Sequence, residues 1–402
     1  MIMNKTNKYE MNNVNFNKRQ FWSYQRLTGA GNSIKNNTHS QKNKTLKSTK
    51  LLKPETSTKP ETSIKPLKTK KIFHVINNKI ATDKKLINRL SSIYIPPAYK
   101  DIVVAKSANN KIQAIGTDKR GRRQYIYNTT FTKKRNDRKY DDILELGKKI
   151  HLIESDNEIA INNLAIKPYS EWSLPNDYIP IIVYMLRTYY FRIGNERYVN
   201  ENNSYGITTL KSQHIKWHDT NSKFTIEFVG KKGILNQFTD NNKKMGIILK
   251  KLIECSKLKG HDNFLFKYKH IMPDESEIIT FIIPEQIQVY FQDKYNSYIT
   301  PKMFRTWYGN YHLLVCLKEL FTTGNIKHRL NKQEKNEIVK KCSEHVSSKL
   351  NNTPTVSKQS YIDNKILELI MRNPYRFASQ IPDSNIIKHN FLLKIIKKIR
   401  NL

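Results

Sequence analysis

The sequence contains little of what marks a membrane-spanning or secreted protein. No window approaches the roughly 18 uninterrupted apolar residues that a helix needs to cross a bilayer, and the first twenty residues, MIMNKTNKYEMNNVNFNKRQ, hold no apolar signal-peptide core. Cysteine is also scarce: the 402 residues include three, and no two of them form a CxxC pair. That spacing argues against a zinc site or a disulfide framework and favours a reducing compartment. We therefore expect a soluble, intracellular protein that does not bind a membrane.

Acidic side chains are scarce relative to basic ones. The chain has 34 Asp and Glu against 71 Lys and Arg, which gives a formal net charge of +37 at pH 7. A field of that sign concentrates polyanions, and nucleic acid is the commonest polyanion in a cell. An anionic membrane is the competing partner, but the absence of apolar segments argues against it. At 402 residues the chain is long enough for two or three domains.

Two signatures of nucleotide-dependent and metal-dependent chemistry are missing as well. The sequence has no GxxxxGK[ST] phosphate loop and no acidic cluster with the spacing of a magnesium site. We expect no cofactor and no metal site in this chain.

Residues 1–70 lack the apolar content of a folded domain. They are rich in Asn, Thr, Ser and Lys, and they contain a short tandem repeat, KPETSTKPETSIKP. Such a composition cannot bury enough apolar surface to offset the entropy lost on ordering. With 15 Lys or Arg against 3 Glu, the segment carries a net charge of +12. The sequence therefore predicts a disordered basic arm.

A small, mostly antiparallel β-domain is predicted over residues 71–141. KIFHVINNKIATD alternates apolar and polar residues and turns at Asn77 and Asn78, as a β-hairpin does. DIVVAK, KIQAIG and RQYIYN follow as short runs rich in β-branched and aromatic residues, which favour strands.

The last of these strands carries the most informative side chains of the β-domain. Because side chains alternate along a strand, Arg123, Tyr125 and Tyr127 share one face. Arg122 lies in the adjoining basic turn, within TDKRGRR. An arginine and two phenols beside such a turn suit phosphate contacts and base-edge contacts in a groove of nucleic acid.

The pattern becomes helical after residue 141. In IPIIVYMLRTYYFRIG apolar residues recur with a helical period, and Gly194 supplies a stop. A β-meander is predicted over residues 206–238, and helices resume from Asn241. The predicted fold class is α+β, with a small antiparallel β N-terminal domain and a mainly α-helical domain over residues 142–402 that contains the meander.

Three cationic residues and one tyrosine of the helical region stand out by their context. Arg192 closes the apolar helix, Lys231 occupies the tip of the meander in FVGKKG, and Arg305 precedes a helix in ITPKMFRTWYGN. Tyr361 follows the small polar residues of LNNTPTVSKQSY and opens the helix IDNKILELI. Each of these residues taken alone has an ordinary explanation as a surface charge or a core side chain.

Taken together, the motifs resemble those of the poxvirus-type and bacterial DNA topoisomerases IB. The resemblance covers about residues 71–375. It implies the catalytic fold that tyrosine recombinases share with topoisomerases IB, in a C-shaped clamp whose two domains cover opposite sides of a DNA duplex. The blocks that carry it, in family order, are IPPAYKDIVV, IQAIGTDKRGRRQYIY, FRIGNERY, GITTLKSQHI, FVGKKG, FRTWYGN and NNTPTVSKQSYID.

The resemblance implies a catalytic site of five residues. The nucleophile falls on Tyr361, the two catalytic arginines on Arg192 and Arg305, and the general acid on Lys231. The fifth position is Asn352, where poxvirus members have a histidine; an amide N–H can still donate to a phosphate oxygen. A phenol with a pKa of about 10 is a poor nucleophile at neutral pH. Cationic donors aimed at the phosphate would stabilise the transition state and favour the phenolate.

The same resemblance implies the DNA contacts. Gln124, Tyr125 and Tyr127 would contact bases and backbone in the major groove, and Arg197 and Tyr198 would hold phosphates. The expected partner is double-stranded DNA, and we expect a monomer that uses neither ATP nor a divalent metal.

Two alternatives of different kinds compete with a topoisomerase. A tyrosine recombinase has the same catalytic chemistry, but recombinases usually have His three residues before the second arginine, where this chain has Lys302. A catalytically inactive DNA-binding or packaging clamp would have the same charge, but it would not need all five site residues.

The over-use of Asn, Ile and Lys is typical of a protein encoded by AT-rich DNA. Together with the poxvirus-type layout it favours a large DNA virus of a eukaryotic host. In that case we expect the protein in the host cytoplasm, in the viral factory or the virion. A bacterial source would place it in the cytoplasm or nucleoid.

Overall fold

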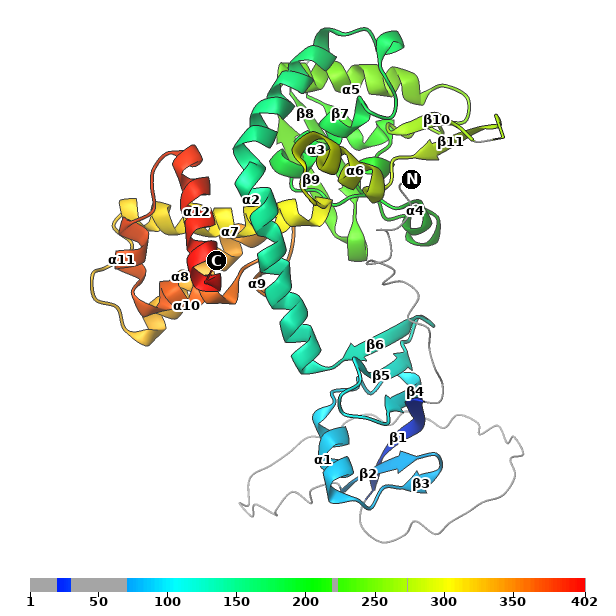
Figure 1. Cartoon of the computed structure of the whole chain (residues 1–402), viewed down its shortest axis with the longest axis vertical. Coiled ribbons are helices and arrows are strands. Elements are labelled where there is room, and N and C mark those ends of the chain that lie inside the picture. Colours follow the sequence, from blue (N-terminus) through cyan, green and yellow to red (C-terminus); the bar gives the residue numbers. More distant parts are fainter. Residues whose placement is uncertain (1–19, 30–70, 219–222, 273, 402) are drawn as a thin grey trace, which may run out of the picture. The chain divides into compact units, whose positions relative to one another are not determined.

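The computed structural model describes residues 20–29, 71–218, 223–272 and 274–401. The chain divides into two compact units, Met1–Arg135 and Asn136–Leu402. The division lies within helix α2 (Thr129–Ile166), as does the boundary that the sequence predicted at residue 141 (Figure 1).

The first unit is built on one six-stranded antiparallel sheet in the order β3-β2-β1-β4-β5-β6. Helix α1 (Lys84–Ser92), capped by Asp83, contributes Leu90 to the core of this unit. The predicted turn at Asn77 and Asn78 is confirmed, since both residues have the positive φ of a tight hairpin turn. The strands are β1 (Phe21–Gly29), β2 (Lys71–Ile76), β3 (Lys79–Ile80), β4 (Lys100–Ala105), β5 (Ile112–Thr117) and β6 (Arg123–Tyr127).

Strand β1 lies inside the segment that the sequence predicted to be disordered, so that prediction is wrong for residues 21–29. Tyr24 is 4% exposed and belongs to the core, and Trp22 packs against the same core. The composition averaged over residues 1–70 concealed this short alternating run, FWSYQRLTG. The rest of the predicted arm, apart from Gln20, lies outside the described residues.

The second unit is mainly helical and contains two small antiparallel sheets, which confirms the predicted α+β class. The predicted meander is the sheet β7-β8-β9 (Ile215–Trp217, Phe224–Val229, Leu235–Asp240), preceded by two 3-10 turns rather than a strand. The hairpin β10-β11 (Lys267–Ile271, Glu277–Phe281) was not predicted. The remaining helices are α3 (Tyr178–Thr188), α4 (Glu196–Asn202), α5 (Lys243–Ser256), α6 (Pro284–Tyr295), α7 (Pro301–Thr322), α8 (Lys332–Lys349), α9 (Pro354–Ser360), α10 (Asn364–Arg372), α11 (Pro374–Ser379) and α12 (Asn385–Arg400).

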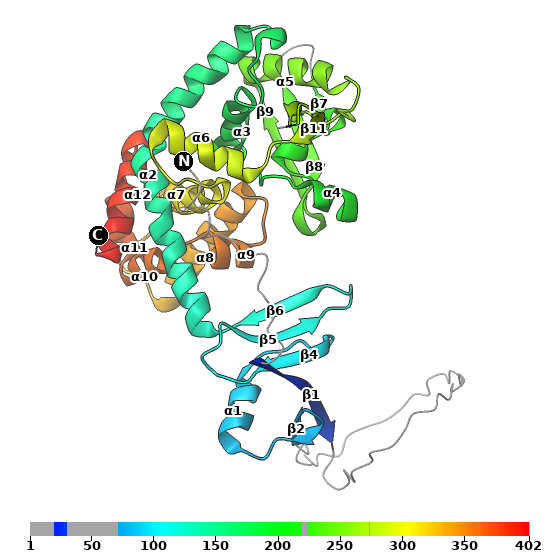
Figure 2. The ribbon, with the colours of Figure 1, turned by 45° about the vertical axis from the view of Figure 1, so that its right-hand side comes forward.

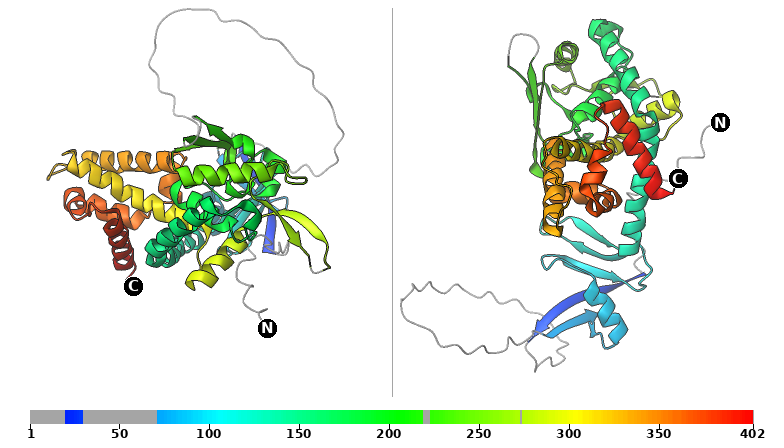
Figure 3. Two further views of the ribbon diagram at one scale, coloured as in Figure 1. Left: turned by 90° about the horizontal axis from the view of Figure 1, so that it is seen from above. Right: turned by 90° about the vertical axis from the view of Figure 1, so that its left-hand side faces the viewer.

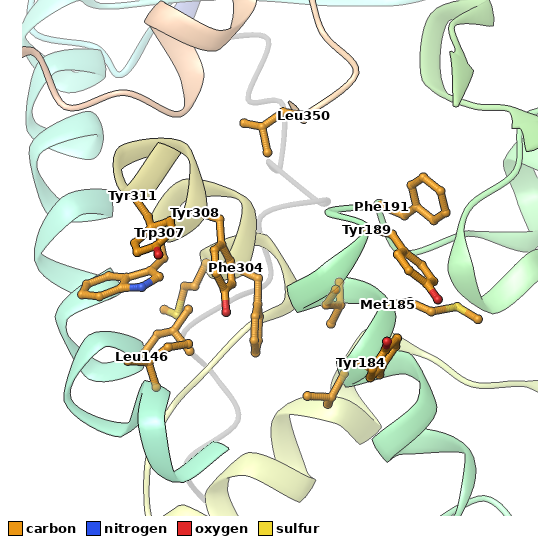
Figure 4. Close-up of a cluster of buried hydrophobic side chains, with 14 of the residues drawn as sticks. Leu146, Tyr184, Met185, Tyr189, Phe191, Phe304, Trp307, Tyr308, Tyr311 and Leu350 are labelled. Carbon is orange, nitrogen blue, oxygen red and sulfur yellow. The ribbon is translucent and has the colours of Figure 1, made fainter. Parts of the chain in front are cut away.

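Helix α7 is the central helix of this unit. It packs against α3, α8, α11 and α12, and Figures 2 and 3 show it alongside α8. Its aromatic side chains Phe304, Trp307 and Tyr308 are buried in one core with Tyr184 and Tyr189 (Figure 4). Burying a side chain of this size stabilises the fold by about 1.5–3 kcal/mol. The helix therefore gives a rigid base to any functional group that it carries.

Helix α3 ends at Thr188, so the prediction that it continues to Gly194 is wrong. Tyr189 and Phe191 are both buried, but they alternate with the less buried Tyr190 and Arg192, which is the pattern of an extended chain. Tyr190 has a φ of 55°, in the left-handed region. A period-3.6 reading of the aromatic run could not detect this change.

In the ranges that the structure describes, no helix combines the length and the apolarity that crossing a bilayer requires.

The contact between α2 and α7 yields a stability prediction. A β-carbon at Gly147 of α2 would lie 2.3 Å from the buried indole of Trp307. Overpacking a core typically destabilises the fold by about 1–3 kcal/mol. Because the indole ring is rigid, we expect this loss to exceed the roughly 1 kcal/mol that alanine gains over glycine in helix propensity. Gly147→Ala should therefore lower the Tm in thermal unfolding. Asn163→Ala, at an exposed position of the same helix, is the control and should not lower it. An unchanged Tm for Gly147→Ala would contradict this packing.

Candidate active site

Tyr361 occupies the end of a short helix rather than the start of one. It is the C-terminal cap of α9, where its N–H donates to the carbonyl of Ser357 at 2.9 Å. The small polar run before it forms this helix, with Pro354 in the first turn and the Thr353 hydroxyl accepting from the N–H of Val356. Helix α10 begins only after a short break. Tyr361 is 6% exposed, so its ring is buried in the unit.

The hydroxyl of Tyr361 accepts hydrogen bonds from two arginines. Arg192 donates from Nη2 at 3.2 Å, and Arg305 donates from Nε at 3.3 Å. The guanidinium carbon of Arg305 also lies 4.9 Å from the centroid of the tyrosine ring. Three residues from distant parts of the chain therefore converge on one oxygen atom.

Arg305 belongs to α7 itself, so the prediction that it precedes a helix is wrong. It is 3% exposed, and its remaining donors go to main-chain carbonyls: Nη1 to that of Tyr190, and Nη2 to that of Leu350 at 2.6 Å. Burial lowers the pKa of Arg305 to about 10, although the neighbouring Tyr361 hydroxyl partly opposes the shift. The group still carries its charge at neutral pH.

Arg192 lies in the extended segment after α3, so it does not close a helix and has no helix dipole to neutralise. Its carbonyl accepts from the N–H of Ile207 at 2.9 Å. A β-carbon at Gly206 would lie 2.6 Å from that carbonyl oxygen, so the close approach of the two segments requires glycine there. This contact fixes the backbone from which the Arg192 side chain reaches Tyr361 and, with Nη2, the Oδ1 of Asn352 at 2.8 Å.

Asn352 follows the end of α8, after Asn351 has turned the chain with a φ of 48°. The side-chain Oδ1 of Asn352 is taken by Arg192, but its Nδ2 is buried and has no hydrogen-bond partner in the described part of the protein. Leaving such a donor unpaired costs about 1–3 kcal/mol. A ligand with an acceptor oxygen, such as a phosphate, would satisfy it.

Lys231 is the one predicted catalytic residue that the structure does not bring into this cluster. It begins the turn between β8 and β9, with its side chain exposed. Within the described ranges, no hydrogen bond or ion pair joins it to the other four residues. The turn at the tip of the meander is as predicted.

Two opposing effects set the ionisation of Tyr361. Burial acts to raise the pKa of its hydroxyl, but the charges of Arg305 and Arg192, and their hydrogen bonds, outweigh burial and lower the pKa below its ordinary value. A lower pKa means a larger fraction of the nucleophilic phenolate at a given pH. The site is thus arranged to make a tyrosine reactive.

The residues predicted to contact DNA in the first unit lie on β6 and the turn before it. Tyr125 is 39% exposed, and it alternates with Ile126, which packs against the core of the unit. Gln124 donates to Asp118 at 3.0 Å, and Arg122 forms an ion pair with the same carboxylate at 2.8 Å. The hydrogen bond from Arg122 lowers the pKa of Asp118 to about 2.

Two further residues complete the predicted face of β6. Arg123, the first residue of the strand, is exposed. The ring of Tyr127 stacks on Phe131 with centroids 5.9 Å apart. The guanidinium carbon of Arg135 lies 5.4 Å from the centroid of the Tyr127 ring.

Arg197 and Tyr198 lie on α4, a few residues after Arg192 in the chain. Tyr198 is 56% exposed, and Arg197 pairs with Glu201 at 2.7 Å. Exposed pairs of this kind contribute about 0–1 kcal/mol, so Glu201 holds Arg197 only weakly.

Among the described residues, no three His, Cys, Asp or Glu side chains are grouped so as to hold a metal ion.

Comparison with known proteins shows the family to which this sequence belongs. A family model of the eukaryotic DNA topoisomerase I catalytic core matches residues 128–381, and a model of the bacterial DNA topoisomerase IB N-terminal domain matches residues 73–118. The DNA topoisomerase 1B of Acanthamoeba polyphaga mimivirus is 31% identical over 335 residues, which cover 82% of this chain and 93% of that protein. The chain belongs to the type IB DNA topoisomerase family.

Poxvirus proteins are related to this topoisomerase more distantly. The DNA topoisomerase 1B of Vaccinia virus (strain Copenhagen) and the DNA topoisomerase I of Monkeypox virus are each 25% identical to it over 300 residues, which cover 73% of this chain and 84% of theirs. The resemblance predicted from the sequence motifs is confirmed. These matches support a type IB topoisomerase and lend no support to the recombinase or the inactive clamp.

Sequence reasoning missed two residues of α7 that contact the topoisomerase's tyrosine. A β-carbon at Gly309 would lie 3.0 Å from the Cβ of Tyr361, so glycine lets the two backbones approach. Asn310 donates from Nδ2 to the Tyr361 carbonyl at 2.9 Å. Both lie within the motif FRTWYGN, and Gly309 follows Arg305 by four residues, which puts them on the same helical face. That spacing could have identified Gly309 once Arg305 was placed in the helix.

The arginine contacts make the pH dependence of DNA cleavage testable. In single-turnover cleavage by this topoisomerase, the rate should rise with pH and reach half its maximum below pH 10, the region where an ordinary phenol ionises. Arg192→Gln removes one of the charges that lower the pKa of Tyr361, so it should move the rising limb to higher pH. It should also slow cleavage by about 10²–10³-fold at neutral pH. A rising limb at the same pH in both proteins would contradict the role given to Arg192.

Proposed function

We propose that this topoisomerase cuts one strand of duplex DNA by attack of Tyr361 on a backbone phosphorus. A bond forms between the tyrosine oxygen and phosphorus, and the bond from phosphorus to the 5′-oxygen breaks. The phenolic proton is lost to solvent, and the departing 5′-oxygen gains a proton. The product is a 3′-phosphotyrosine. The observation that carries the proposal is the Tyr361 hydroxyl held by both Arg192 and Arg305.

The cationic cluster supplies what the transition state requires. A pentacoordinate phosphorus gathers negative charge on its nonbridging oxygens, and preorganised donors stabilise that charge most where water is excluded. Arg192 and Arg305 provide two guanidinium groups, and the unpaired Nδ2 of Asn352 provides a neutral donor beside them. Losing one such donor typically costs about 10²–10³-fold in rate.

Lys231 is proposed as the general acid for the leaving oxygen. The 5′-hydroxyl must acquire its proton as the bond breaks, because an alkoxide is a poor leaving group. The ammonium of Lys231 stands exposed on a turn, where bound DNA can meet it. Proton donation by a positioned side chain is typically worth about 10²–10⁴-fold in rate.

Religation is proposed to be the same reaction in reverse. The phosphotyrosine bond stores an energy similar to that of the original phosphodiester, so rejoining needs no ATP. While the 5′ end is free, the cut strand can rotate about the intact one and release supercoils of either sign. In cleavage and in religation, Arg192 and Arg305 supply the positive charge that a metal ion would otherwise supply.

The β6 residues are proposed to hold the duplex while this happens. The exposed side chains of Arg123 and Tyr125 offer a charge and an aromatic surface to a DNA groove, with Arg122, Gln124 and Tyr127 beside them. Arg197 and Tyr198 on α4 would contact phosphates near the cleavage site. We further propose that the protein acts as a monomer that clamps the DNA.

The setting of the reaction is also a proposal. The relatives named above are viral proteins, and we propose that this topoisomerase acts in the cytoplasm of a host cell on viral DNA.

The nucleophile assignment is tested by Tyr361→Phe. Removing the hydroxyl should abolish both the relaxation of supercoiled plasmid and the covalent protein–DNA adduct seen after denaturation. Binding of duplex DNA should remain, because the ring and the basic surface are kept. The wild-type protein without ATP and with a chelator is the positive control. Relaxation or adduct formation by Tyr361→Phe at the wild-type rate would refute the assignment.

The general-acid role is tested by the leaving group. Lys231→Met should slow cleavage of ordinary DNA by about 10²–10⁴-fold. A substrate whose 5′-oxygen at the cleavage site is replaced by sulfur expels a thiolate, which needs no proton because a thiol has a far lower pKa than an alcohol. On that substrate Lys231→Met should cleave nearly as fast as wild type, while Arg192→Gln stays slow. An equal deficit of Lys231→Met on both substrates would exclude the role.

A further inference from the structure

The main chain around Tyr361 is held by side chains from two other helices, α2 and α7. Three consecutive carbonyls each accept a hydrogen bond from a side chain far away in the sequence. The donors are Lys139 Nζ to Ser360 at 2.8 Å, Asn310 Nδ2 to Tyr361 at 2.9 Å and the Tyr140 hydroxyl to Ile362 at 2.5 Å. Asn310 also accepts, through Oδ1, from the N–H of Asp363 at 2.8 Å.

Two of these donors are neighbours on α2. Lys139 Nζ donates to the Tyr140 hydroxyl at 3.0 Å and lies 4.1 Å from the centroid of its ring. Tyr140 is 6% exposed, and its hydroxyl has the Ile362 carbonyl as acceptor. Lys139 lies 221 residues before Ser360 in the sequence, and Tyr140 lies 222 residues before Ile362. No local motif requires it.

A buried ion pair holds the end of the same segment. Arg400 of α12 donates from Nη2 to Asp363 at 2.6 Å, and the two side chains are 4% and 3% exposed. The other carboxylate oxygen of Asp363 accepts from the N–H of Lys365 and so caps α10. The guanidinium carbon of Arg400 also lies 5.4 Å from the centroid of the Tyr140 ring. Asp137 and Asp141 of α2 lie within 3.7 Å of the Arg400 guanidinium.

The segment needs external support because it lies between two helices. Residues at helix ends have carbonyl groups with no intrahelical partner. In the break between α9 and α10 the N–H groups of Tyr361 and Ile362 both donate to the Ser357 carbonyl, whereas the carbonyls of Ser360, Tyr361 and Ile362 accept from the distant side chains named above. The direction in which the Tyr361 hydroxyl points depends on where this backbone lies. A misplacement of about 1 Å at a reacting group can cost about 10²-fold in rate.

We propose that Lys139, Tyr140 and Arg400 are positioning residues for the cleavage reaction. They fix the backbone on both sides of Tyr361, so that its hydroxyl remains between the guanidinium groups of Arg192 and Arg305 before DNA binds. The inference rests on the proposed role of Tyr361 as the nucleophile. In the contacts given above, Lys139 and Tyr140 donate to main-chain carbonyls and Arg400 donates to the Asp363 carboxylate, so all three act on Tyr361 indirectly.

Tyr140→Phe tests the proposal without changing any charge. Only the hydroxyl that holds the Ile362 carbonyl is lost. Tyr178→Phe is the matched control, because Tyr178 is fully buried and its hydroxyl also donates to a main-chain carbonyl, that of Lys267 at 3.1 Å. Single-turnover rate constants for cleavage and religation, the Kd for duplex DNA and the Tm should be measured for both variants.

Tyr140→Phe should lower the cleavage and religation rate constants together by about 10–100-fold, with the Kd within about twofold of wild type. Tyr178→Phe should keep both rate constants within about twofold at a comparable loss of Tm. Wild-type cleavage by Tyr140→Phe would overturn the proposal. Equal slowing by the two variants would also overturn it, since the effect would then follow from lost stability alone.

A second pair of variants tests Arg400. Arg400→Met should slow cleavage, and Arg400→Lys should recover most of the rate, because lysine can still donate to Asp363. A lysine variant as slow as the methionine variant would count against a positioning contact. Tyr361→Phe, measured in the same experiments, distinguishes a failure of the nucleophile assignment from a failure of the positioning role. Adduct formation by Tyr361→Phe overturns the nucleophile assignment, whereas an inactive Tyr361→Phe beside a fully active Tyr140→Phe overturns only the positioning role.

Discussion

The buried guanidinium of Arg305 is the group on which the geometry of the catalytic unit depends. It is 3% exposed, and it donates to the main-chain carbonyls of Tyr190 and Leu350 and to the hydroxyl of Tyr361. One side chain of α7 thus joins three segments that the sequence keeps apart. Burying a charge is costly unless it is hydrogen-bonded, and here these three acceptors offset the cost. Because burial lowers its pKa only to about 10, the group remains charged at neutral pH and can act on a phosphate.

Much of the site could be predicted because its chemistry dictates residue types in short motifs. FRIGNERY, FRTWYGN and NNTPTVSKQSYID contain Arg192, Arg305, Asn352 and Tyr361, and the structure brings these four together through hydrogen bonds. Strands β4, β5 and β6 were also predicted, because alternation of β-branched and aromatic residues is a local signal. The position of Lys231 relative to the site was not predictable, since an exposed turn has no packing that fixes its side chain.

Other features could not be read from the sequence because they depend on contacts between distant residues. Strand β1 is stabilised by pairing with β2 and β4, and nothing within residues 21–29 reveals those partners. Helix α3 ends where the aromatic residues change from a helical to an alternating burial pattern, which only the surrounding core shows. Lys139, Tyr140 and Arg400 look like ordinary members of basic helices. Their importance comes from carbonyls and a carboxylate around Tyr361, which a local pattern cannot reveal.

The central claim is that the hydroxyl of Tyr361, held by two arginines, becomes bonded to DNA phosphorus. Mass spectrometry of the adduct tests this most directly. The protein is trapped on a duplex whose short fragment on the 3′ side of the cut, which carries the free 5′-hydroxyl, dissociates after cleavage. The complex is then digested with protease and nuclease, and the modified peptide is sequenced. The account predicts a single modified peptide, with a nucleotide joined through its 3′-phosphate to Tyr361. A nucleotide on any other residue, or one joined through a 5′-phosphate, would contradict it.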